Sequence, residues 1–214
     1  MRARRVKKLD PAAPFAENAA RIIRVRLDEM RSFAPAALEP EAASDQHDMR
    51  IAAKRLRYVL EVTESFFGRP AKLARGRARD LQDMLGALHD CDVMIPRVER
   101  HLAKLQEADA EAVLAGAGEA VDLEPAAAAR APHRTAYRGL EILIVYLRAR
   151  RTLLFERFAS FWAEQERSRT WDRLERETTR RIREDRSRRR AAKRAENARE
   201  LLEAATPPSP GALA

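Results

Sequence analysis

The chain has 214 residues, with 42 Lys and Arg against 33 Asp and Glu, which gives a formal net charge of +9 at neutral pH. Only 7 residues are glycine, and good helix formers such as Ala, Leu, Arg and Glu outnumber β-branched and aromatic residues. This composition argues against a β-sandwich, a β-barrel and a doubly wound sheet. It predicts an all-α fold, an antiparallel bundle of four to five core helices followed by a long charged C-terminal helix.

Helical periodicity and helix-breaking residues divide the chain into successive predicted helices. The first five are expected at residues 14–33, 44–67, 71–93, 96–114 and 133–165. Pro35 and Pro40 break the pattern after the first helix, Gly68 and Pro70 after the second, and Pro96 fits the first turn of the fourth. Residues 115–132 are expected to form a loop or a frayed segment.

Four segments are predicted along the chain. They are a basic disordered N-terminus (1–13), a helical bundle (14–165), an Arg- and Glu-rich helical extension (166–204) and a disordered Pro-rich tail (205–214). Ser44 or Asp45 is expected to cap the second helix. The extension has few apolar anchors, so we expect a solvated helix that frays towards its end.

Cysteine usage and apolar runs bear on the compartment. The single cysteine, Cys91, excludes an intramolecular disulfide and a cysteine-based zinc cluster, and is typical of a reducing compartment. No run of about 18 apolar residues is present to span a membrane. The basic residues 2–8 are not followed by the apolar segment of a secretory signal. We therefore expect a cytoplasmic protein without a membrane partner.

The net charge comes from the two ends of the chain. Residues 1–8 contribute +5 and residues 164–203 contribute +4, so the remainder sums to zero. Within that neutral body, residues 47–79 carry nine basic and three acidic side chains, whereas residues 80–124 carry three basic and eleven acidic ones. This sorting favours a local basic site, although solvated helices with mixed charge are the alternative interpretation.

One face of the second predicted helix concentrates cations. At 100° per residue, an arc of about 100° opposite an apolar stripe holds His47, Arg50, Lys54, Arg57 and Tyr58. Like charges one turn apart repel each other, so a compensating group is expected. Glu61 on the same face can neutralise one charge, and a bound polyanion would neutralise the rest.

The next predicted helix supplies a facing set. Its polar face carries Arg75, Arg79, Gln82, Gly86 and His89. Two antiparallel helices joined at residues 68–70 would present a ladder of Arg and Lys, whose side chains suit phosphate oxygens. Nucleic bases would need aromatic platforms for stacking, and Tyr58 is the only aromatic residue near the cations. The pattern therefore favours a ligand made wholly of phosphate.

Two sequence blocks resemble a known family. Residues 47–58 read HDMRIAAKRLRY and residues 81–93 read LQDMLGALHDCDV. Together they resemble the CHAD domain, the conserved histidine α-helical domain, over residues 15 to 165. The resemblance implies a helical bundle whose basic central surface binds inorganic polyphosphate, no catalytic activity, and in some members targeting to polyphosphate granules. Members often accompany a CYTH-type triphosphate-processing domain, and nothing in this chain resembles one.

The blocks and the helical plot together define a predicted site. The first block contributes its histidine and its cations, flanked by Arg55 and Tyr58, as the resemblance implies. The helical plot adds Arg75 and Arg79, and also Arg26, whose head is expected to reach a central cavity. The predicted polyphosphate site consists of His47, Arg50, Lys54, Arg55, Arg57, Tyr58, Arg75, Arg79 and Arg26. No catalytic residue, metal ligand or cofactor is predicted.

The chain departs from the family pattern in one respect. Full-length members contain two four-helix halves, each with a His-x-x-Arg block, whereas the chain has this block once. It therefore resembles one half, and a homodimer would restore the second half by symmetry. The alternative function is a nucleic-acid-binding or adaptor protein that uses its basic ends. An enzyme is not expected, because the sequence contains no glycine-rich phosphate loop and no Ser-His-Asp or Cys-His arrangement for nucleophilic catalysis.

Overall fold

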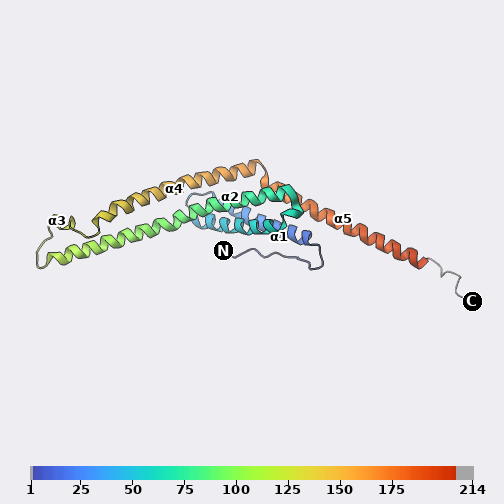
Figure 1. The fold of residues 1–214 in the computed structure, drawn as a ribbon, viewed down its shortest axis with the longest axis horizontal. Helices are drawn as coiled ribbons and strands as arrows, with labels where there is room; N and C mark the ends of the chain where they lie inside the picture. The colour runs from blue at the N-terminus through green and yellow to red at the C-terminus, as the bar shows by residue number, and fades with distance from the viewer. Residues whose placement is uncertain (1, 206–214) are drawn as a thin grey trace, which may run out of the picture.

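The computed structural model describes the backbone of residues 2–205 and the side chains of residues 2–201. The chain is 84% helical and its described residues form no strand, which confirms the predicted all-α fold. The helices are α1 (Phe15–Ala37), α2 (Ala43–Ala117), α3 (Pro125–Ala128), α4 (Arg134–Arg167) and α5 (Thr170–Ala205). They form an elongated molecule with a central body, a two-helix arm at one end and the tip of α5 at the other (Figure 1).

Helix α2 folds back on itself at Gly68, as the sequence predicts. Gly68 has φ 64° and ψ −148°, a conformation that is essentially restricted to glycine. It separates a first limb, residues 43–67, from a second limb, residues 69–117. The predicted break before Pro96 is wrong, because the second limb continues through this proline to Ala117. The prediction that Pro35 ends the first helix is also wrong, since α1 continues to Ala37.

The start of α2 is held by a different residue from the predicted caps. Neither Ser44 nor Asp45 caps the helix, which begins one residue earlier and has no side-chain cap. Instead the buried amide of Gln46 donates hydrogen bonds to carbonyl groups at and just beyond the end of α1. The acceptors are the backbone oxygens of Ala37, Glu39 and Pro40, at 3.3, 2.9 and 3.3 Å.

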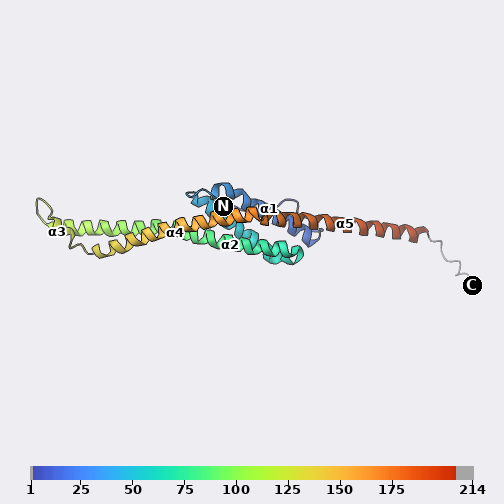
Figure 2. The same cartoon turned by 90° about the horizontal axis from the view of Figure 1, so that it is seen from above.

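The core of the body lies between α1 and the two limbs of α2. Small side chains at steps of three and four let the second limb approach its neighbours closely. The fully buried positions that the second limb contributes to this core are Ala71, Ala74, Ala78, Leu81, Leu85 and Leu88. Helix α1 contributes Ile23, Leu27 and Met30 to the same cluster. Figure 2 shows α1 and the second limb on either side of α5 and the end of α4.

The junction between α4 and α5 closes the body. Phe158 and Trp162 near the end of α4 are buried with Trp171 and Leu174 at the start of α5. The two tryptophan rings stack with their centroids 6.1 Å apart. The first part of α5 therefore belongs to the core, whereas every described side chain from residue 186 onwards is exposed. None of the described helices is long and apolar enough to cross a membrane.

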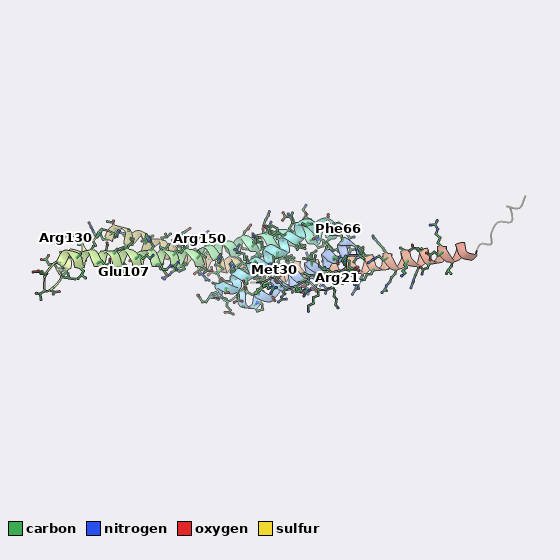
Figure 3. All side chains as sticks on the ribbon, turned by 90° about the horizontal axis from the view of Figure 1, so that it is seen from below. Arg21, Met30, Phe66, Glu107, Arg130 and Arg150 are labelled. Carbon is green, nitrogen blue, oxygen red and sulfur yellow. The ribbon has the colours of Figure 1, made fainter. Side chains whose placement is uncertain are left out.

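The arm consists of the far part of the second limb and the first half of α4. Its small apolar cluster is built on Val98, Ile144 and Leu147. Figure 3 places Glu107 and Arg130 out on the arm and Met30 in the body. Near its tip the buried carboxylate of Asp109 accepts hydrogen bonds from the Tyr137 hydroxyl (2.5 Å) and from the backbone and ring nitrogens of His133 (3.0 and 2.7 Å).

The N-terminal segment, predicted to be disordered, lies along α1 from residue 2 and makes a turn at residues 10–13 before the helix begins. The backbone nitrogen of Arg4 donates to Glu29 (2.9 Å), and Arg26 donates to the carbonyl of Arg4 (2.8 Å). Helix α5 is fastened nearby, because Arg186 lies 2.9 Å from the buried carboxylate of Glu17. The predicted disordered tail falls, apart from Ala205, outside the described residues.

Candidate functional site

The two limbs of α2 bring the two sequence blocks face to face. Because the limbs run antiparallel, His47 lies opposite His89, Arg50 lies against Gly86, and Arg57 reaches Gln82. We call this set the basic ladder. Its members are His47, Arg50, Lys54, Arg57 and Tyr58 on the first limb and Gln82, Gly86 and His89 on the second.

One end of the basic ladder is a pair of histidines. The ring centroids of His47 and His89 are 4.5 Å apart and their planes are tilted by 48°. Burial lowers the pKa of His47, and so do the neighbouring charges of His89 and Arg50, against an opposing effect of Asp48. Atom Nδ1 of His47 is buried and has no hydrogen-bond partner among the described residues.

The middle of the basic ladder holds its least neutralised cations. The absence of a side chain at Gly86 lets the stem of Arg50 lie close, since a Cβ built there would be 3.9 Å from Cδ of Arg50. Atom Nε of Arg50 is buried and has no hydrogen-bond partner among the described residues. Neither Arg50 nor Lys54 forms an ion pair within the part of the chain that the structure describes. A buried charged donor without a partner favours the binding of an anion.

Arg57 is oriented by three neighbours. Its Nε donates to Oε1 of Gln82 at 3.1 Å, and its Nη1 is 3.6 Å from Glu61. The guanidinium carbon also lies 4.3 Å from the centroid of the Tyr58 ring, while Nζ of Lys54 is 5.8 Å from that centroid. Such cation–π contacts hold the two cations beside the Tyr58 ring. The face of the Tyr58 ring is therefore covered by the guanidinium group of Arg57.

The structure places two predicted site residues elsewhere. Arg55 lies 3.0 Å and Arg26 lies 2.5 Å from the carboxylate of Glu29, which is fully buried between α1 and the first limb. Both guanidinium groups thus neutralise a carboxylate in the body. The expected reach of Arg26 into a cavity shared with the ladder is not observed.

The other two predicted arginines lie beyond the ladder on the second limb. Arg75 pairs with Glu64 of the first limb at 2.6 Å, so its charge is balanced. Arg79 is 64% exposed, and its nearest carboxylate is that of Asp80 at 4.0 Å. Arg79 is therefore available to extend the ladder, whereas Arg75 mainly ties the limbs together.

Helix α4 adds a cation that the helical plot of α2 did not contain. Nε of Arg151 is 2.5 Å from Asp92 on the second limb, and its Nη2 donates to Gln46 at 3.4 Å. Arg151 thus clamps the two limbs beside the histidine pair. His89 was visible in the sequence as a member of the facing set but was not included in the predicted site. Arg151 lies about a hundred residues from the first block, and no local pattern connects them.

The arrangement supports electrostatic binding. Among the described residues, no group of three or more His, Cys, Asp or Glu side chains is placed to hold a metal ion. The ladder instead offers guanidinium, ammonium and imidazole donors along one line. Such donors hold anionic oxygens through charge-assisted hydrogen bonds.

Comparison with known proteins identifies the family. No curated protein and no solved structure matches the chain. The family model of the CHAD domain, however, matches residues 21–213. The match includes α5, which the sequence pattern alone had separated from the bundle, and it covers nearly the whole chain. The chain belongs to the CHAD domain family.

Proposed function

We propose that the protein binds inorganic polyphosphate at the basic ladder and catalyses no reaction on it. Members of the CHAD family bind polyphosphate in general. The observation that carries the proposal is that Arg50 and Lys54 lack carboxylate partners among the described residues. Beside them lie two buried nitrogens without a hydrogen-bond partner among the described residues, Nδ1 of His47 and Nε of Arg50. A chain of phosphates would supply oxygens to these donors and charge to the cations.

The geometry favours a linear anion. From Arg50 to Arg57 the first limb rises about 10 Å, and three cations follow one another along that distance. A compact anion would contact one or two of them, whereas a polymer of phosphates can contact all three in turn. Its binding should weaken steeply with added salt, because counterions are released from both surfaces.

The central test removes the charges of Arg50 and Lys54. Replacing Arg50→Gln together with Lys54→Gln keeps most of each stem and breaks no ion pair among the described residues. Because a charge-assisted hydrogen bond contributes about 1.5–3 kcal/mol, we expect affinity for long-chain polyphosphate to fall at least about 100-fold in titration calorimetry. The slope of log affinity against log salt should drop by about one to two.

A matched control removes the same charge from the same helix. Arg97 and Lys104 are exposed on the arm part of α2, so Arg97→Gln with Lys104→Gln should leave affinity within about twofold. Equal losses in both double variants would contradict the assignment of the basic ladder. Gel analysis of polyphosphate after incubation with the protein, with or without Mg²⁺, should show chains of unchanged length.

Nucleic-acid binding is the second candidate, and the exposed end of α5 is the observation that favours it. Residues 186–201 are all exposed and carry seven Arg and Lys against two Glu. Competition between polyphosphate and single- or double-stranded DNA at physiological salt separates the candidates. The α5 variant for this test replaces with Gln the residues Arg188, Arg190, Lys193 and Arg194. Loss of DNA binding in this variant, with polyphosphate binding intact, would assign the two ligands to different surfaces.

A further inference from the structure

Helix α4 presents a second apolar face that points away from its packed neighbour. Ile142, Tyr146, Ala149 and Leu153 follow one another at steps of four, three and four residues, and we call them the outer seam. Ile142 and Tyr146 are each 59% exposed and Leu153 is 51% exposed. The opposite side of the helix already packs in the arm through Leu147. In Figure 1, α4 forms the upper edge of the molecule, with no other element above it.

The spacing of the outer seam is that of a helix–helix contact. Apolar residues alternating at three and four positions form the seam of paired helices. Val145 and Leu143 lie beside the seam and are 66% and 37% exposed, which widens the apolar surface. Contiguous apolar patches on monomers are rarely large unless they serve an interaction. The described chain ends at Ala205, on the side of the body opposite the arm (Figure 1).

We infer that the outer seam is a dimer interface on which α4 of a second copy packs antiparallel. A twofold axis between residues 147 and 148 would place Ile142 of one copy opposite Leu153 of the other. The same axis would place the large ring of Tyr146 opposite the small side chain of Ala149. The seam is therefore complementary to itself in size, as a closed twofold interface requires.

Charge complementarity supports the same register. In the antiparallel arrangement Arg138 of one copy lies next to Glu156 of the other, and symmetry repeats the pair. Both side chains are exposed, and neither forms an ion pair within the described part of the chain. Gly139, which would face Glu156, leaves room for this pairing. The interface needs no ligand, so it goes beyond the proposed binding of polyphosphate.

The test measures mass in solution without polyphosphate, by sedimentation velocity over about 1–100 µM protein. The wild-type chain should form a dimer. Replacing Ile142→Glu together with Leu153→Glu should raise the dissociation constant of the dimer at least 100-fold. The control, Val62→Glu, places the same charge at a position on the body that is 71% exposed, and it should remain dimeric.

Charge reversal tests the register. Arg138→Glu alone and Glu156→Arg alone should each weaken the dimer, and the two changes together should restore it. A monomeric wild-type protein, or a dimer that survives both seam substitutions, would overturn the proposed interface. Failure of the double reversal to restore the dimer would overturn the antiparallel register. Polyphosphate affinity measured on the seam variant reports separately on the basic ladder, because these residues lie outside it.

Discussion

His47 and His89 meet with their rings 4.5 Å apart across the two limbs of α2, although each belongs to a different sequence block. The contact depends on the reversal at Gly68, which turns two blocks that follow each other in sequence into facing surfaces. It also affects the charge state of the basic ladder, because burial and the charge of His89 lower the pKa of His47.

Polyphosphate affinity should rise as pH falls. Burial and the charges of His89 and Arg50 lower the pKa of His47, so this ring is neutral at about pH 7.5 and takes up a proton only at more acidic pH. A bound polyanion stabilises the protonated ring, and uptake of one proton increases affinity by at most about tenfold per pH unit. Calorimetry at about pH 7.5 and about pH 5.5 measures the effect. His47→Asn should flatten the profile, and an unchanged slope in that variant would assign the proton to another group.

Gly86 should tolerate one added carbon but not a long side chain. A Cβ at this position makes ordinary contact with Arg50, and alanine is favoured over glycine in a helix by about 0.5–1 kcal/mol. Gly86→Ala should therefore increase the free energy of unfolding by about that amount, measured in denaturant, without changing affinity. Gly86→Leu should displace Arg50 and weaken polyphosphate binding about tenfold.

Gly76 provides the control for both changes at Gly86. It lies in the same limb with no atom within 4 Å of an added Cβ. Gly76→Ala should give a similar gain in stability, and Gly76→Leu should leave affinity unchanged. If Gly86→Leu also leaves affinity unchanged, Arg50 does not contact the ligand from this position.

Loss of the buried carboxylate of Glu29 should destabilise the fold. Glu29 balances Arg26 and Arg55, whose side chains are only 12% and 25% exposed. Removing one partner of a buried ion pair costs about 3–5 kcal/mol, so Glu29→Gln should lower the free energy of unfolding by about 3 kcal/mol. Glu141→Gln, at an exposed position of α4, should have little effect.

The same variant distinguishes a structural from a ligand-binding role for these arginines. Because Arg26 and Arg55 face Glu29 rather than the basic ladder, Glu29→Gln should leave polyphosphate affinity unchanged under conditions where it is folded. A rise in affinity would show that the released guanidinium groups reach the ligand, as the sequence predicted for Arg26 and Arg55.

The tip of the arm should loosen at high pH. The hydrogen bond to Asp109, together with burial, raises the pKa of Tyr137 to about 12. A raised pKa means that the neutral hydroxyl contributes stability below about pH 10, and that this contribution is lost as pH rises towards 12. Ultraviolet titration should show one tyrosine ionising near pH 12, and Tyr137→Phe should remove that component.

At acidic pH the same cluster responds with the opposite sign. Burial would raise the pKa of Asp109, but hydrogen bonds from Tyr137 and His133 outweigh it and hold this pKa below the ordinary value. Its contribution to stability is therefore present above about pH 4 and is lost as pH falls through the lowered pKa. Hydrogen exchange of the backbone amides at the arm tip measures the loss of stability at both acidic and high pH. If Tyr137→Phe protects these amides as well as the wild-type chain does at neutral pH, the role of this cluster is contradicted.

Much of the basic ladder could be predicted from the sequence because it lies on two adjacent helix faces. A helical plot depends only on the rise and turn of the backbone, so the grouping of His47, Arg50, Lys54 and Arg57 was visible before any tertiary contact was known. The turn at Gly68 was visible for a similar local reason.

The placement of Arg26 and Arg55 could not be predicted in this way. Their partner, Glu29, lies three residues from Arg26 but on another helix from Arg55, and the burial of all three depends on how α1 crosses the first limb. The predicted helix break before Pro96 was also wrong because of tertiary packing. A proline removes one backbone hydrogen bond, but packing of α4 along the second limb keeps the helix continuous through it.

The unbroken second limb fixes the position of the arm relative to the body. From His89 to Ala117 it runs as one rod of about 40 Å, with no break in its helical geometry after Gly68. A molecule bound at the arm would therefore lie at a set distance and angle from the cations of the basic ladder. Two molecules joined through α4 would hold their basic ladders at a fixed separation. Only a polymer long enough to span that separation would contact both ladders.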